Sequence, residues 1–144
     1  MSGYRDYYPL DFVDREKVRN FVILTGDAHS SWGFDVPRDP WSGYRAATGE
    51  GSLAVELVTP AISSPTPAMF SGDQGQNMAA AIRVALPHLK LVDGTHHGYV
   101  IVDVTPTIMR ADWYFVPDVR VRSDLETQGG SVVCERGSAH LQSA

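Results

Sequence analysis

The stretch from Phe21 to Trp32 most constrains the fold, because it changes from apolar to polar within a few residues. Its first part, Phe21–Thr25, is a run of apolar and β-branched residues that predicts a strand buried on both faces of a sheet. Gly26 permits a tight turn there, and Asp27 and His29 follow directly. Open α/β sheets bind ligands outside the carboxyl ends of their strands, so we expect both side chains to lie in a binding crevice.

Asp27 and His29 are two residues apart, so their side chains share one side of an extended backbone. A carboxylate oxygen and an imidazole nitrogen suit zinc, iron, manganese or a mixed pair of metals, although two ligands do not hold a metal ion alone. The pattern therefore predicts half of a metal site. The alternative is an ordinary turn in which Asp27 caps the next segment and His29 is a surface residue. The residues by themselves leave these two interpretations equally open.

The composition narrows the classes of function. A chain of 144 residues fits one domain, and 43% hydrophobic with 20% charged residues is typical of a folded globular protein. No apolar run approaches the roughly 20 residues that span a bilayer. The net charge of -5 argues against a sequence-independent nucleic-acid binder, which needs a basic surface. A phosphate-ester substrate remains compatible with this charge, because metal ions can supply the positive field.

Cysteine usage and the N-terminus add two further expectations. Cys134 is the single cysteine, which excludes an intrachain disulfide and a cysteine-based zinc cluster, and we expect a buried, inert thiol. The first residues contain no basic segment followed by an apolar core, so no signal peptide is expected in this chain.

Periodicity and breakers divide the chain into strands and two helices. The first helix is expected from Asp11 or Asp14 to Val18 or Arg19, and the second over Gln76–Leu86. Residues 38–51 are expected to form a long mobile loop, and Ala61–Gly75 contains too many prolines, serines and glycines for regular structure. The expected strands are Phe21–Thr25, Ser31–Val36, Ser52–Thr59, His88–Val92, Gly98–Val104, Ile108–Val116 and Ser131–Glu135. Strands outnumber helices too strongly for a complete doubly wound domain, so the fold class is α/β with a β-rich mixed sheet.

Three blocks carry a resemblance to a known family. They read FVILTGDAHSSW, SLAVELVTPAISSPTP and HGYVIVDVTPTIMRADWYFV. In this order they resemble the C-terminal part of the PhoD-like alkaline phosphatases and phosphodiesterases, which belong to the calcineurin-like metallophosphoesterases. The closing segment SVVCERGSAHL resembles the last strand of the family more loosely. The resemblance implies that residues 1–144 are one unit, the C-terminal half of a four-layer sandwich in which two mixed sheets pack between helices.

The same resemblance implies a function. Family members hydrolyse phosphate esters with a metal cluster, iron and calcium have been associated with that cluster, and many members are exported. The motif GDAHS matches a late family motif, which makes Asp27 and His29 metal ligands by resemblance, whereas the early metal motifs of the family are absent. The chain is therefore expected to be inactive alone and to associate with itself or with a missing N-terminal segment. The alternative is a non-catalytic β-rich interaction module derived from the same fold.

The remaining candidate residues are less defined. His96 and His97 are adjacent, so on a strand they point to opposite sides and cannot chelate one ion together, and a role for either with metal or phosphate is left open. We expect His88 and His140 to be solvated. Ser30 and Ser31 lack the Gly-x-Ser-x-Gly context of a hydrolase nucleophile. The segment TPAISSP lies either near the substrate side of the fold or in a plain surface connection. Catalytic and substrate-binding residues stay unassigned.

Overall fold

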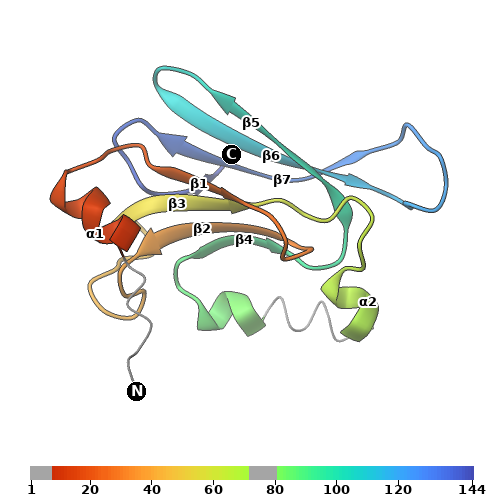
Figure 1. Ribbon diagram of the computed structural model, residues 1–144, viewed down its shortest axis with the longest axis horizontal. Helices are drawn as coiled ribbons and strands as arrows, with labels where there is room; N and C mark the ends of the chain where they lie inside the picture. The colour runs from red at the N-terminus through yellow and green to blue at the C-terminus, as the bar shows by residue number, and fades with distance from the viewer. Residues whose placement is uncertain (1–7, 72–80) are drawn as a thin grey trace.

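The computed structural model describes residues 8–71 and 81–144, which form two stacked β-sheets with short helices (Figure 1). The first sheet contains β1 (Val22–Thr25), β2 (Ser31–Pro37), β3 (Ser52–Val58) and β4 (Leu89–Asp93). The second sheet contains β5 (His97–Val104), β6 (Ile108–Val116), β7 (Thr127–Glu135) and β8 (Gln142–Ser143). The expectation of a strand-rich mixed α/β fold is confirmed.

The pairing of strands differs between the two sheets. The first sheet has the order β1-β3-β2-β4, in which β1 runs parallel to β3 while β2 is antiparallel to both of its neighbours. The second sheet has the order β5-β6-β7-β8 and is antiparallel throughout. Because β1 and β3 are parallel, their carboxyl ends lie at the same end of the first sheet.

The core lies between the two sheets, as the strand periodicity predicts. In β6 the apolar residues Met109, Ala111, Trp113 and Phe115 face the core and are buried, and Trp113 is fully buried at the centre. Its indole Nε1 donates a hydrogen bond of 3.2 Å to the Val58 carbonyl, which ties the second sheet to the end of β3. The buried core cluster consists of Val55, Leu57, Met109, Ala111, Trp113, Phe115, Val132, Cys134 and Leu141.

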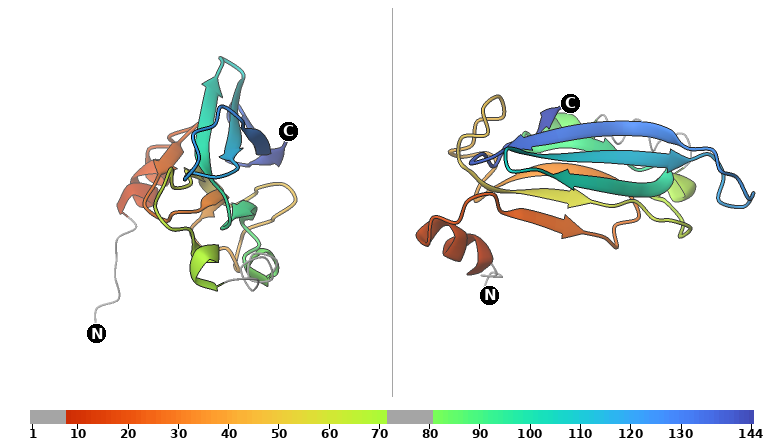
Figure 2. Two further views of the ribbon diagram at one scale, coloured as in Figure 1. Left: turned by 90° about the vertical axis from the view of Figure 1, so that its right-hand side faces the viewer. Right: turned by 90° about the horizontal axis from the view of Figure 1, so that it is seen from above.

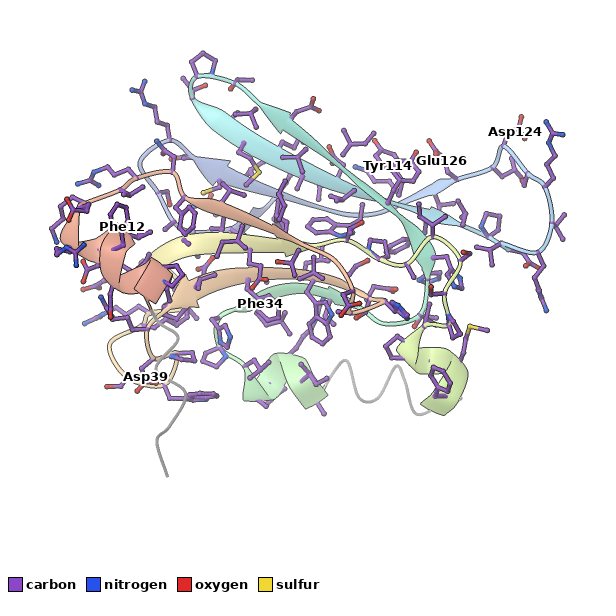
Figure 3. All side chains as sticks on the ribbon, in the orientation of Figure 1. Phe12, Phe34, Asp39, Tyr114, Asp124 and Glu126 are labelled. Atoms are coloured by element: carbon purple, nitrogen blue, oxygen red, sulfur yellow. The ribbon has the colours of Figure 1, made fainter. Side chains whose placement is uncertain are left out.

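Helical segments flank the first sheet. α1 spans Tyr8–Arg15, α2 spans Pro67–Ser71, and residues 81–85 are also helical. α2 and the 81–85 segment lie on the side of the first sheet that faces away from the second sheet (Figures 1 and 2). Figure 3 shows Phe34 on that side of the first sheet and Tyr114 on the outer side of the second sheet. None of the helices in the described ranges has the length and apolar character needed to cross a membrane.

Several expected boundaries require correction. The first helix begins at Tyr8, before Asp11, because Pro9 is tolerated in a first turn. α2 forms inside the segment Ala61–Gly75, which was expected to be irregular. Part of the expected helix Gln76–Leu86 lies outside the described residues, and its last residues, 81–85, are helical. The short strand β8 has too few residues for a sequence pattern to indicate it.

The burial of the first strand was also predicted wrongly. β1 is the outermost strand of its sheet rather than a central one, and Leu24 is 67% exposed. A short apolar run is compatible with a strand buried on both faces, but it contains no information about which strands will flank it. The expected position of the turn, directly after Thr25, is confirmed.

Candidate functional site

The candidate site lies where the carboxyl ends of β1 and β3 meet. The 26–30 loop follows β1, and the 59–66 loop follows β3 at the same end of the sheet, which is the right-hand end in Figure 1. The hydrogen bond from Thr59 N to Thr25 O, 2.9 Å long, extends the pairing of the two strands into the beginning of the second loop. Open α/β sheets place ligands at this kind of position.

The backbone of the 26–30 loop has an unusual conformation. Asp27 has φ 70° and His29 has φ 53°, in the left-handed region that residues other than glycine rarely adopt. The amide of Ala28 donates a hydrogen bond of 2.9 Å to the Gly26 carbonyl, which closes a three-residue γ-turn centred on Asp27. A γ-turn with positive φ is rare and strained. Such strained residues cluster at functional sites, where surrounding contacts hold them in place.

Ser30 and Trp32 hold the loop in this conformation. The Ser30 hydroxyl donates to the Ala28 carbonyl at 2.9 Å and accepts a hydrogen bond of 2.7 Å from the Trp32 indole. Ser30 is buried, and its hydroxyl hydrogen is engaged in the bond to the Ala28 carbonyl. Ser31 is buried as well, and its hydroxyl oxygen has no hydrogen-bond partner within the described residues.

His29 is oriented by the loop that follows β3. Its Nδ1 lies 3.0 Å from the Pro65 carbonyl oxygen. A carbonyl oxygen only accepts, so Nδ1 carries the hydrogen in this bond and Nε2 of the neutral ring keeps its lone pair. Histidines that bind metals typically use the second ring nitrogen in this way, because the bond fixes both the tautomer and the ring orientation.

Asp27 is an exposed carboxylate without a hydrogen-bond or salt-bridge partner in the described part of the chain. Near the end of β1, the Asp27 carboxylate and His29 Nε2 therefore both have a lone pair that is available to a metal ion. Within residues 8–71 and 81–144 no group of three or more His, Cys, Asp or Glu side chains is placed to hold a metal ion. The residues present thus fit part of a metal site and not a complete one, and the two-ligand assignment stays a prediction.

The two adjacent histidines have separate positions. His96 Nδ1 lies 2.9 Å from Asp93 Oδ2, and its ring stacks on Phe115 with the ring centres 4.7 Å apart. His97 Nε2 lies 2.8 Å from the Ser64 carbonyl oxygen. The expected divergence of the two rings agrees with these different partners. His97 therefore contacts the same loop as His29, whereas His96 belongs to the turn between β4 and β5.

His140 and His88 were wrongly expected to be solvated. His140 is 8% exposed, and its Nδ1 lies 2.6 Å from Oδ2 of the fully buried Asp35. His88 is half-buried, and the loss of hydration lowers its pKa below the usual value, although the charge of Asp35 acts in the opposite direction. Strand periodicity did place Asp35 within β2, but no local signal indicates a partner that lies 105 residues away.

Asp35 also anchors the 38–51 loop, which was expected to be mobile. The Tyr44 hydroxyl donates to Asp35 Oδ2 at 2.8 Å, and burial together with this bond raises the pKa of Tyr44. Lys90 Nζ lies 3.5 Å from the same oxygen and donates to the Ala46 carbonyl at 2.6 Å. The loop is thus tied to both β2 and β4, at the opposite end of the first sheet from His29.

The fold defined by these sheets matches a solved structure. The chain superposes on the structure titled "Structure of PhoD" with a TM-score of 0.75 and 23% sequence identity, covering 94% of this chain and 24% of that chain. The likeness shows that this chain has the fold of the corresponding part of that protein.

The sequence comparison then identifies the family. The sequence model of the PhoD-like phosphatases matches residues 5–113, so the chain belongs to the PhoD-like phosphatase family. Alkaline phosphatase D of Bacillus subtilis (strain 168) is 27% identical over 132 residues, which are 90% of this chain and 19% of that protein. The chain thus spans about a fifth of the length of this curated relative.

Proposed function

We propose that this chain contributes the Asp27 and His29 ligands to the metal centre of a phosphoric ester hydrolase. The observation that carries the proposal is the hydrogen bond between His29 Nδ1 and the Pro65 carbonyl, which leaves Nε2 free and fixes the ring. Membership in the PhoD-like phosphatase family supports the reaction class. The strained turn at Asp27 supports a functional role for the same loop.

The residues of this chain would act by binding and orientation. Asp27 would offer a carboxylate oxygen and His29 would offer Nε2, while Pro65 holds the imidazole in place. Metal ions bound there would activate a water molecule and neutralise the phosphoryl oxygens of the substrate. The resemblance of the sequence points to iron and calcium. Iron takes imidazole nitrogen and carboxylate oxygen ligands, whereas calcium takes oxygen ligands such as the Asp27 carboxylate.

Ligand number limits what the chain does alone. A catalytic metal site needs about three protein ligands, and two leave the ion poorly positioned. Rate acceleration depends on holding the reacting groups within about half an ångström of the productive geometry. We therefore expect the remaining ligands to come from the part of the longer relatives that this chain does not match.

Exposed apolar side chains support an association with further protein. Leu24 on β1 is 67% exposed, and Ile101 and Val104 on β5 are 43% and 75% exposed. β1 and β5 are also the outermost strands of their sheets in the described structure, and unpaired strand edges favour association. We propose that the chain self-associates or binds a preceding segment. Light scattering that shows a stable monomer would contradict this proposal.

Hydrolysis of chromogenic phosphate esters tests the proposed function. The assay compares the 144-residue chain with a chimera in which it replaces the matching segment of the Bacillus subtilis relative, each with added iron and calcium. We expect negligible turnover of a phosphomonoester or a phosphodiester by the chain alone, and metal-dependent turnover by the folded chimera. Metal-dependent turnover by the chain alone would contradict the claim that it is incomplete.

Substitutions in the chimera test whether Asp27 and His29 act as metal ligands. Asp27→Asn and His29→Ala are each expected to lower turnover by at least about 100-fold. Loss of an outer-shell partner of a metal ligand already costs about 10- to 100-fold, and loss of the ligand itself should cost no less. Asp39→Asn is the matched control, since Asp39 lies in the 38–51 loop at the other end of the molecule (Figure 3). A folded chimera that is indifferent to both site substitutions would remove Asp27 and His29 from the site.

A further inference from the structure

The Ala61–Thr66 loop has no regular structure, yet other segments hold it at several points. The amide of Gly98 donates to the Ala61 carbonyl at 3.0 Å, and the buried Thr66 hydroxyl donates to the Thr95 carbonyl at 3.3 Å. Directly after the loop, the amide of Ala68 donates to the Gly94 carbonyl at 3.1 Å. The start of β5 and the turn before it thus fix both ends of the loop.

Two imidazoles bind neighbouring carbonyls in the middle of this loop. His97 Nε2 lies 2.8 Å from the Ser64 oxygen, and His29 Nδ1 lies 3.0 Å from the Pro65 oxygen. Both acceptors are carbonyls, so each ring nitrogen donates. His29 comes from the loop between β1 and β2 and His97 from the first residue of β5, so the short loop segment connects the two sheets.

The chemistry of proline couples these two hydrogen bonds. The Ser64 carbonyl belongs to the planar peptide unit that ends at the nitrogen of Pro65. The proline ring fixes the next torsion, φ, near about −65°. Only ψ of Pro65 is then free to change the direction of one carbonyl relative to the other. A displacement of the Ser64 carbonyl therefore moves the Pro65 carbonyl and the imidazole of His29.

His97 is well placed to fix this arrangement, because its own backbone is rigidly held. His97 pairs with Val116 in the second sheet, and the next residue, Gly98, packs directly on the backbone of β6. A Cβ atom at Gly98 would lie 1.9 Å from the Tyr114 carbonyl oxygen, so only glycine allows this approach. The imidazole of His97 thus projects from a fixed point of the second sheet toward the loop.

We propose that His97 is a positioning residue: its hydrogen bond to the Ser64 carbonyl holds the Ala61–Thr66 loop where the Pro65 carbonyl fixes the tautomer and orientation of His29. The consequence for catalysis rests on the proposed function, in which His29 uses Nε2 as a metal ligand. The structural part of the proposal does not, because it concerns contacts within the chain itself.

Two substitutions of His97 separate the hydrogen bond from the volume of the ring. His97→Gln keeps an N–H donor, whereas His97→Phe keeps a planar ring and removes the donor. His96→Gln is the matched control, because His96 contacts Asp93 and Phe115 rather than the loop. Pro65→Ala provides a second test at an exposed position, since it releases the fixed torsion and leaves both histidines intact.

The measurements use the 144-residue chain without added metal. Long-range ¹⁵N–¹H NMR spectra at about pH 9, where imidazoles are neutral, report which nitrogen of His29 carries the hydrogen. Backbone order parameters report the motion of Ile62, Ser63 and Ser64 on the picosecond to nanosecond timescale. If His97 only stabilised the fold, its substitution would leave the tautomer of His29 unchanged. The tautomer therefore separates positioning of His29 from general stabilisation.

We expect the Nδ1–H tautomer of His29 and an ordered loop in the wild type, in His97→Gln and in His96→Gln. His97→Phe is expected to shift His29 toward the Nε2–H form, which a solvated histidine side chain prefers, and to lower the loop order parameters to below about 0.6. Pro65→Ala should produce an intermediate change. The proposal is overturned if His29 keeps its tautomer and the loop keeps its order in folded His97→Phe or Pro65→Ala. Because no metal is present, this outcome is independent of whether Asp27 and His29 bind one.

Discussion

Asp35 on β2 and His140 near the C-terminus are joined by a buried hydrogen bond of 2.6 Å between Oδ2 and Nδ1. The other carboxylate oxygen accepts the amide of Leu141 at 2.8 Å. The carboxylate thus fastens the last segment of the chain onto the first sheet, and it is fully buried. Buried charges of this kind are stable only with such partners.

Removing this carboxylate should therefore destabilise the fold strongly. Asp35→Ala leaves the Tyr44 hydroxyl, His140 Nδ1 and the amide of Leu141 without the acceptor that they share. It also removes the carboxylate that lies 3.5 Å from the Lys90 ammonium group. Removal of one partner of a buried ion pair lowers the free energy of unfolding by about 3–5 kcal/mol. Urea unfolding should show this loss, while Asp124→Ala, an exposed control in the 118–126 loop, should change the free energy of unfolding by less than about 0.5 kcal/mol. Equal midpoints for the two variants would contradict the role of Asp35.

A glycine next to His140 gives a second stability test. Gly49 has φ 70°, and a Cβ at this position would lie 2.4 Å from His140 Cβ. Gly43 has a similar φ of 78°, but a Cβ there would have no neighbour within 4 Å. Both alanine variants are destabilised because alanine disfavours a positive φ. Only Gly49→Ala adds a steric clash, which costs about 1–3 kcal/mol. Thermal unfolding should show a clearly lower Tm for Gly49→Ala than for Gly43→Ala. Equal Tm values would mean that His140 moves away from the new methyl group without loss of stability, which contradicts a rigid packing of His140 against Gly49.

Asp112 should make the stability depend on pH at the acid end. Arg110 donates hydrogen bonds to its carboxylate, and this pairing lowers the pKa of the buried Asp112 below the usual value. The unfolded chain then binds a proton at a higher pH than the folded chain does, so this stabilisation is complete above about pH 4 and is lost as the pH falls through the folded pKa. Urea midpoints between about pH 5 and pH 2 should fall less steeply in Asp112→Asn and Arg110→Gln than in the wild type. An unchanged slope in both variants would contradict the assignment.

The second sheet shows how much the sequence predicts. The bounds of β6 were predicted correctly, because Met109, Ala111, Trp113 and Phe115 alternate with more polar residues and all four are buried. The alternation exists because one face of an antiparallel sheet packs on the core. The position of the Asp27–His29 loop after the first strand was predicted correctly for a related reason, since the change from apolar to polar residues marks the end of a strand.

What the sequence did not predict depends on contacts between distant residues. The partner of Asp35 is far away in the chain, and the outermost position of β1 depends on which strands pair with β3. The positive φ of Asp27 has no strong local signal either, because aspartate adopts many turn conformations. The contact of His29 and His97 with adjacent carbonyls follows from the packing of the two sheets, which no periodicity reveals.

The metal content of the chimera with the Bacillus subtilis relative shows whether Asp27 and His29 bind metal. Elemental analysis after gel filtration would give the iron and calcium bound per chain, together with turnover of the same samples. We expect Asp27→Asn and His29→Ala each to lower the bound metal and the turnover together, because each substitution removes a ligand, while Asp39→Asn changes neither. Folded chimeras that keep full metal content and full turnover after each of the two substitutions would show that Asp27 and His29 are not metal ligands.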